Sequence, residues 1–218
     1  MFFAGCTLRC TYCQNHTISA EGFGKDVTPQ RLRAIFEELI AQGAHNIDLI
    51  TPTHFLPWIL PALEPKLPVP LVYNCGGYER VETLRSLEGL VDIYLPDFKY
   101  ISPALSAKYS HAPDYADVAK AAVAEMVRQC PRPVFDGDEA EDPIEEGLLM
   151  RQGVIVRHLL LPGCTRDSKA VIKYLYETYG NQIYLSIMNQ YTPLENVSAY
   201  PELNRKVTDE EYEEVVHY

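Results

Sequence analysis

Long hydrophobic runs and an excess of basic residues are both missing from this sequence. No stretch approaches the ~18 consecutive apolar residues that a membrane-spanning helix needs, so we expect no membrane segment. Acidic residues outnumber basic ones by 30 to 19, which gives a formal net charge of −11. Because no basic stripe is present to neutralise phosphates, we expect neither a nucleic-acid partner nor an anionic membrane surface as partner.

Cysteine is scarce as well, with six residues in a chain of 218. A disulfide framework is typical of short secreted chains with paired cysteines, and no secretory signal precedes the first cysteine here. Hydrophobic residues make up 47% of the sequence and charged residues 22%, which is ordinary for a globular protein with a substantial core. The composition therefore predicts a single domain over residues 1–218 in a reducing, cytoplasmic compartment.

Three of the six cysteines are crowded into one short segment near the start of the chain. Cys6, Cys10 and Cys13 are spaced as C-x3-C-x2-C in GCTLRCTYCQN. Three thiolates on one loop can hold three corners of a cubane iron–sulfur cluster. No fourth cysteine follows at a matching spacing, so one iron would keep an open position at which chemistry can occur. The alternatives are a structural zinc site that includes His16 and a disulfide.

The segment FFAGCTLRCTYCQN resembles the cluster loop of the radical S-adenosylmethionine (radical SAM) enzymes, and it is most similar to the branch related to pyruvate formate-lyase-activating enzyme. The shared features are the cysteine spacing, Gly5 and the aromatic Tyr12 before the third cysteine. The resemblance implies that Cys6, Cys10 and Cys13 bind a [4Fe-4S] cluster whose open iron chelates S-adenosylmethionine (SAM). It also implies reductive cleavage of SAM to methionine and a 5′-deoxyadenosyl radical, with Tyr12 beside the adenine. In the other interpretation of Tyr12, it is a loop aromatic that packs on the cluster.

Strand-like and helix-like segments alternate along the chain, which predicts a parallel sheet. The predicted strands are 1–4, 46–51, 70–74, 91–97, 153–161 and 182–188. The predicted helices are 27–43, 54–63, 79–87, 102–110, 114–130, 168–180 and 208–218. Six strands suit a partial (β/α)6 TIM-like barrel, which is also the fold that the resemblance implies, and an open doubly wound sheet is the alternative. In either fold the ligand site lies at the carboxyl ends of the strands.

Local signals set some boundaries. Thr28 and Pro29 are typical of a helix start, and Thr208 with Glu211 predicts a capping box. The acidic stretch at about 136–146 is interpreted as a loop or hairpin insertion. Only four residues precede Gly5, fewer than the ~5–6 of an ordinary strand. Proteins with the cysteine segment described above usually carry more chain at both ends, so we expect either a truncated sequence or a shortened member.

Polar residues follow several of the predicted strands, at the edge where a barrel enzyme binds its ligand. After the second strand, most radical SAM enzymes carry a Gly-Gly-Glu segment that meets the amino group of SAM, whereas this chain has Thr51, Pro52, Thr53 and His54. We expect backbone carbonyls to receive the ammonium there, with Thr51 or Thr53 adding a hydroxyl. For His54, a place at the start of the next helix and a catalytic role are equally compatible with the sequence.

The third and fourth strands also end in polar turns. Asn74 and Cys75 precede two glycines, and this turn resembles the family's polar segment that approaches SAM, although a tight turn alone would explain the glycines. Asp97 and Lys99 resemble the family's Asp-x-Lys, in which the lysine would neutralise the SAM carboxylate. Their other interpretation is a surface ion pair, which the burial expected at a strand end disfavours.

These features predict a radical SAM enzyme that uses a [4Fe-4S] cluster and SAM for hydrogen abstraction. The resemblance implies a glycyl radical protein or another peptide as the partner and an external one-electron reductant. The alternative function is a non-catalytic iron–sulfur protein for electron transfer or interaction, with a degenerate form of the same fold.

Overall fold

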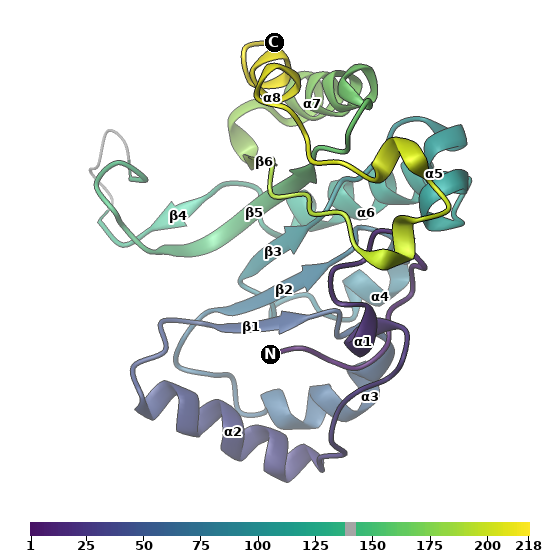
Figure 1. Ribbon diagram of the computed structural model, residues 1–218. Coiled ribbons are helices and arrows are strands. Elements are labelled where there is room, and N and C mark those ends of the chain that lie inside the picture. Colours follow the sequence, from purple (N-terminus) through teal and green to yellow (C-terminus); the bar gives the residue numbers. More distant parts are fainter. Residues whose placement is uncertain (138–142) are drawn as a thin grey trace.

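The computed structural model describes residues 1–137 and 143–218, and its centre is one curved, open sheet (Figure 1). The strands are β1 (Ile47–Ile50), β2 (Leu71–Cys75), β3 (Ile93–Pro96), β4 (Val134–Phe135), β5 (Met150–Leu159) and β6 (Tyr184–Met188). β1, β2, β3, β5 and β6 run parallel in that order, whereas β4 pairs antiparallel with the first residues of β5. The predicted parallel sheet and partial barrel are confirmed, and the sheet does not close.

Helices surround this sheet. The α helices are α1 (His16–Ser19), α2 (Pro29–Ala41), α3 (Leu56–Ile59), α4 (Val81–Arg85), α5 (Pro103–Ser110), α6 (Tyr115–Gln129), α7 (Thr165–Tyr179) and α8 (Asp209–Val216). The 3-10 helices are η1 (Thr53–Phe55), η2 (Leu60–Leu63), η3 (Gly180–Gln182), η4 (Glu195–Val197) and η5 (Pro201–Leu203). In Figure 1, α2 and α3 lie below β1, α7 and α8 lie above β5 and β6, and α6 lies behind the middle strands. None of the described helices is long and apolar enough to cross a membrane.

Two capping predictions are confirmed. The Thr28 side chain accepts a hydrogen bond from the Arg31 backbone N–H at the start of α2, with Pro29 in the first turn. Thr208 and Glu211 form the capping box of α8. These contacts satisfy amide groups that the first turn of a helix leaves unpaired.

Three predicted elements need correction. The helix predicted over 54–63 is broken into η1, α3 and η2, because Pro57 and Pro61 remove backbone N–H donors inside it. The first strand, predicted over 1–4, is reduced to an isolated parallel bridge between Phe2 and Ile50. β5 begins at Met150 rather than at residue 153, because its first residues pair with β4.

The paired strands β4 and β5 lie on either side of the acidic insertion predicted at about 136–146. β4 and the start of β5 flank it as the two arms of an antiparallel hairpin, and they extend away from the rest of the sheet in Figure 1. Residues 138–142 of the insertion lie outside the described residues. The antiparallel pairing of the flanking strands is compatible with a hairpin, and the insertion itself stays a prediction.

The carboxyl ends of the parallel strands meet at one edge of the sheet. The amino-terminal loop (dark purple in Figure 1) and the segment that follows β6 (yellow-green) both lie along this edge. Gly77 follows β2 there with a φ of +77°, and a Cβ atom at this position would collide with the backbone carbonyl oxygen of Asp97. The turns after β2 and β3 therefore pack against each other more closely than any side chain allows.

Replacement of Gly77 by alanine is expected to destabilise the fold strongly. The new methyl group must displace backbone and also adopt a strained φ, so we expect a loss of about 3–5 kcal/mol in the free energy of unfolding. Gly89→Ala is the matched control, because Gly89 has a φ of +80° with open space around it; only the conformational cost of about 1–2 kcal/mol remains there. Urea denaturation measures both. Equal losses in the two variants would contradict the close packing.

Candidate functional site

The amino-terminal loop is held in place by His54 and by helix α5. Gly5 has a φ of +93°, and a Cβ atom on it would lie 2.9 Å from Nε2 of His54. The same Nε2 donates a hydrogen bond to the Ala4 carbonyl at 2.6 Å. The Thr11 backbone N–H donates to the Tyr109 carbonyl at 2.8 Å. His54 thus holds the chain just before the first cysteine of the loop, and it lies in η1.

The three cysteines of this loop border one cavity. Its volume is about 310 Å³, and its lining is formed by Cys6, Leu8, Arg9, Cys10, Thr11, Cys13, His16, Ser19, Ala20 and Asn196. Asn196 comes from η4, far along the chain. Both polar atoms of its side chain are buried and have no hydrogen-bond partner among the described residues. A buried amide without a partner is costly, so this cavity is suited to a group that supplies one.

The thiols themselves fit an iron–sulfur cluster. All six cysteines are among the described residues and carry free thiols, which leaves the disulfide alternative without support. Across residues 1–137 and 143–218, no three His, Cys, Asp or Glu side chains are grouped as a site for a single metal ion. The structural zinc alternative therefore has no geometric support. Cysteines on a cubane each bind a different iron, so they need not converge on one point.

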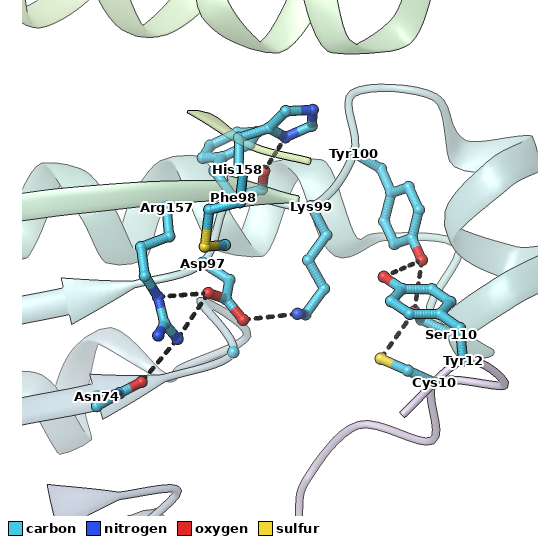
Figure 2. A network of polar contacts seen from close by, with 12 residues as sticks. Cys10, Tyr12, Asn74, Asp97, Phe98, Lys99, Tyr100, Ser110, Arg157 and His158 are labelled. Carbon is cyan, nitrogen blue, oxygen red and sulfur yellow. Dashed lines mark hydrogen bonds and ion pairs between the residues drawn. The ribbon is translucent and has the colours of Figure 1, made fainter. Parts of the chain in front are cut away.

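Cys10 is backed by a buried row of hydroxyl groups (Figure 2). Ser110 Oγ donates a hydrogen bond to Cys10 Sγ at 3.0 Å. The hydroxyl of Tyr100 lies 2.9 Å from Ser110 Oγ and 2.6 Å from the hydroxyl of Tyr12. Tyr12 is 6% exposed and contacts the ring of Tyr191 edge-on. Protein groups thus enclose Tyr12, as expected for a loop aromatic that packs behind the cluster ligands; its place beside an adenine stays a prediction.

Asp97 is the centre of a charged set on the neighbouring strand ends. Its carboxylate accepts hydrogen bonds from Lys99 Nζ at 2.6 Å and from Arg157 Nε at 3.0 Å (Figure 2). Arg157 Nη2 also donates to Oδ1 of Asn74 at 2.8 Å, and the Asn74 amide donates to Asp48 at 3.2 Å. The structure therefore brings together three of the predicted site residues, and Arg157 links them.

Charge decides the protonation of this set. Burial alone would raise the pKa of Asp97, but the charges of Lys99 and Arg157 outweigh it and hold that pKa below its usual value. Burial would likewise lower the pKa of Lys99, and the Asp97 carboxylate more than offsets this and raises it. Burial raises the pKa of the Cys10 thiol, while the nearby Lys99 charge and the hydrogen bond from Ser110 act in the opposite direction. Two cations facing one carboxylate leave a net positive charge next to the cysteine loop.

The two threonines after β1 bond to protein groups. Thr51 has a φ of +54°, and its hydroxyl donates to the Ile50 carbonyl at 2.8 Å. Thr53 Oγ1 lies 2.7 Å from the Tyr73 hydroxyl and donates to Glu79 Oε2 at 2.9 Å. The threonine hydroxyls expected to face SAM are thus used inside the protein, and Thr53 leads to a carboxylate.

Glu79 is a residue that the sequence reasoning missed. The helix predicted over 79–87 begins at this residue. In the structure Glu79 lies in the turn before α4, and only 3% of its surface is exposed. Burial raises the pKa of Glu79 to about 7, although hydrogen bonds from Thr53, Cys75 and Tyr73 act in the opposite direction. No ion pair between Glu79 and a cationic side chain occurs within the described ranges. A charged residue two positions after a Gly-Gly turn at a strand end was the available signal.

Neighbouring side chains of β5 point to opposite faces of the sheet, which places Arg157 and His158 in different surroundings. Arg157 faces Asp97, whereas His158 on the other face is buried between the Phe98 carbonyl at 2.7 Å and Ser168 Oγ at 2.8 Å (Figure 2). Burial lowers the pKa of His158. The remaining cysteines lie outside the cavity lining: Cys75 and Cys130 are buried, and Cys164 precedes α7. Their contacts are structural.

The pH dependence of stability is expected to report on Glu79. Its folded-state pKa of about 7 lies above the usual 4.5, so the folded state binds more protons, and stability falls as the pH rises from about 4.5 to about 7. Glu79→Gln removes this loss and should gain about 3 kcal/mol relative to the unmodified chain between pH 4 and pH 8. Urea denaturation at a series of pH values measures it.

Glu82→Gln, at an exposed position on α4, is the matched control and should run parallel to the unmodified chain. A constant difference between Glu79→Gln and the unmodified chain at all pH values would show that Glu79 is an ordinary surface carboxylate.

Comparison with known proteins gives sequence and structure relatives. No protein-family profile matches this chain. An uncharacterized protein of Methanocaldococcus jannaschii, MJ0674, is 27% identical over 230 residues. That alignment covers 99% of this chain but 60% of the relative, so the chain spans less than two thirds of that protein.

Solved structures share the architecture. SuiB of Streptococcus suis bound to precursor peptide SuiA superposes with a TM-score of 0.62 and 11% identity, over 99% of this chain and 44% of SuiB. Native anSMEcpe with bound AdoMet, which is SAM, and the Kp18Cys peptide has a TM-score of 0.61 and 11% identity, over 98% and 56%. Methylornithine synthase (PylB) has a TM-score of 0.59 and 14% identity, over 99% and 60%.

These neighbours are radical SAM enzymes, and at such identities the likeness concerns the fold. The chain therefore has the open partial-barrel fold of the radical SAM enzymes.

Proposed function

We propose that this protein is a radical SAM enzyme that holds a [4Fe-4S] cluster through Cys6, Cys10 and Cys13. The observation that carries the proposal is the placement of these three free thiols around one cavity, at the carboxyl edge of an open parallel sheet. A cluster with one open iron needs three thiolates on one side and room on the other. The orphaned amide of Asn196 at the same cavity supports a bound group there.

The chain's own residues would then bind and orient the cofactors. The cluster, when bound, supplies the electron that cleaves SAM reductively to methionine and a 5′-deoxyadenosyl radical. The net positive charge of the Asp97, Lys99 and Arg157 set is suited to the carboxylate of SAM. Asn74, Thr51 and Thr53 act through the protein groups that they bond, because their polar atoms already have partners.

Glu79 supplies the carboxylate that the turn after β1 lacks. The family's Gly-Gly-Glu segment, which meets the amino group of SAM, is replaced here by Thr-Pro-Thr. Glu79 is buried and interacts electrostatically with Cys6. A buried carboxylate without a cationic partner favours the binding of a cation. We therefore assign the ammonium of SAM to Glu79, positioned by Thr53 at 2.9 Å.

The substrate is proposed as a peptide or protein segment. SuiB and anSMEcpe have been solved with bound peptides, and the sheet of this chain is open at its side. Activation of a glycyl radical protein is the finer form of this proposal, and it rests on the resemblance of the cysteine segment alone. An external one-electron reductant is required, and an oxygen-sensitive cluster suits the reducing cytoplasm.

Anaerobic reconstitution tests the function. Protein loaded with iron and sulfide, reduced with dithionite and supplied with SAM should form 5′-deoxyadenosine, measured by liquid chromatography. Cys10→Ala should abolish the product, because a two-cysteine loop cannot hold the cluster. Cys130→Ala, outside the cavity, should retain it. A full cluster signal without product would instead favour the electron-transfer or interaction alternative.

Affinity for SAM tests the role of Glu79. Glu79→Gln removes the charge but keeps the shape, so the Kd for SAM should rise about tenfold or more, the size of one charge-assisted hydrogen bond. Glu82→Gln should leave the Kd unchanged. Equilibrium dialysis of the anaerobic, cluster-loaded protein gives both values. An unaltered Kd in Glu79→Gln would remove Glu79 from the site.

A further inference from the structure

The hydroxyl row behind Cys10 is built from residues that are distant in sequence. Tyr12 is on the cysteine loop, Tyr100 lies between β3 and α5, and Ser110 is the last residue of α5. Ser110 is 2% exposed and Tyr100 is 1% exposed. In a buried environment each of these hydrogen bonds is electrostatically stronger than at a surface. A second thiol contact runs from Cys13 Sγ to Ser19 Oγ at 3.2 Å, and within residues 1–137 and 143–218 no further hydroxyl bonds that serine.

Hydrogen counting fixes the direction of the Ser110 contact. Each hydroxyl carries one hydrogen, and a cysteine that binds iron is a thiolate, which can only accept. The hydrogen of Ser110 is therefore directed at Cys10 Sγ at 3.0 Å. The Tyr100 hydroxyl lies 2.9 Å from Ser110 Oγ and donates to the Tyr12 hydroxyl at 2.6 Å. Ser110 is thus the hydroxyl that bonds the sulfur, and the two tyrosine hydroxyls hold it from behind.

We propose that Ser110, supported by Tyr100 and Tyr12, raises the reduction potential of the cluster bound through Cys10; the inference rests on the proposed function. Reduction adds negative charge to a cluster, and part of that charge lies on its thiolate ligands. A hydrogen bond donated to such a sulfur stabilises the reduced form more than the oxidised form, and hydrogen bonds to sulfur are among the determinants of cluster potentials.

Ser110 does not itself bind the cluster. It is a positioning residue, because it affects electron uptake only through its hydrogen bond to the ligand Cys10. Lys99 contributes in the same direction, because a nearby positive charge stabilises negative charge that reduction adds to the cluster. The two residues differ in how directly they act on the Cys10 sulfur. The Lys99 charge is shared with Asp97 at 2.6 Å, whereas Ser110 bonds the sulfur directly. The structure thus provides a contact that can be removed without changing the charge of the site.

A redox titration of the anaerobic, cluster-loaded protein without SAM tests this. In Ser110→Ala, the ratio of reduced to oxidised cluster at a fixed potential should fall about tenfold, which is a shift of about 59 mV for one electron. Tyr100→Phe keeps Ser110 but removes the hydroxyl that lies 2.9 Å from its Oγ and positions it, so a smaller fall in the same direction is expected. Electron paramagnetic resonance of the reduced cluster gives the ratio.

Two controls match these changes. Ser106→Ala removes a fully buried hydroxyl of the same helix, which donates to the Pro103 carbonyl. Tyr94→Phe removes a buried hydroxyl that donates to Gln129. Among the described residues neither hydroxyl bonds Cys6, Cys10 or Cys13, so both variants should keep the potential of the unmodified protein. Iron and sulfide content, measured for every variant, separates a change in potential from a loss of cluster.

The outcomes separate the two proposals. A cluster-loaded Ser110→Ala with an unchanged or raised potential overturns the role of Ser110. If Ser110→Ala does not retain the cluster, Tyr100→Phe decides: an unchanged potential overturns the inference, and a lowered one supports it. If the unmodified protein takes up no [4Fe-4S] cluster, the proposed function itself fails.

Discussion

The ion set around Asp97 is the interaction on which the site depends. This carboxylate bonds Lys99 and Arg157, and Arg157 extends to Asn74, so charge as well as backbone joins the ends of β2, β3 and β5. These side chains are part-buried, so loss of one partner leaves a charge that water compensates only in part. The set has two cations and one anion, and the remaining positive charge is next to Cys10. The same ion set therefore joins the strand ends and makes this edge of the sheet positively charged.

Features with a local cause could be predicted from the sequence. The caps at Thr28 and Thr208 depend on residues within one turn, and both appear as expected. The strand and helix alternation predicted the parallel sheet, since hydrophobic periodicity is a property of each segment alone. The break in the helix after β1 was also readable, because Pro57 and Pro61 cannot donate the bonds that a continuous helix needs. The cysteine spacing is equally local, and the iron–sulfur centre that it predicts is part of the proposed function.

Features that depend on distant contacts could not be predicted. Glu79 was assigned to a helix, and only the packing of β1 and β2 shows that its carboxylate is buried against Thr53. Ser110 and Asn196 carry no motif; one meets Cys10 across 100 residues of chain, and the other completes the cavity from the segment after β6. The roles expected for Thr51 and Thr53 assumed free hydroxyls, which neighbouring groups had already engaged. The sequence shows which polar side chains are present, whereas the tertiary structure determines which groups they bond.

The cysteine loop owes its shape to parts of the chain that are made much later. Thr11 is held by Tyr109, which is 98 residues further on, and Gln14 donates to the Gln190 carbonyl, 176 residues further on, at 3.1 Å. Because a ribosome releases the amino-terminal end first, the three thiols leave it long before the segments that orient them. Iron and sulfide delivered during synthesis would meet an unshaped loop. Under the proposed function, we therefore expect cluster insertion to follow translation, when the last strand has joined the sheet.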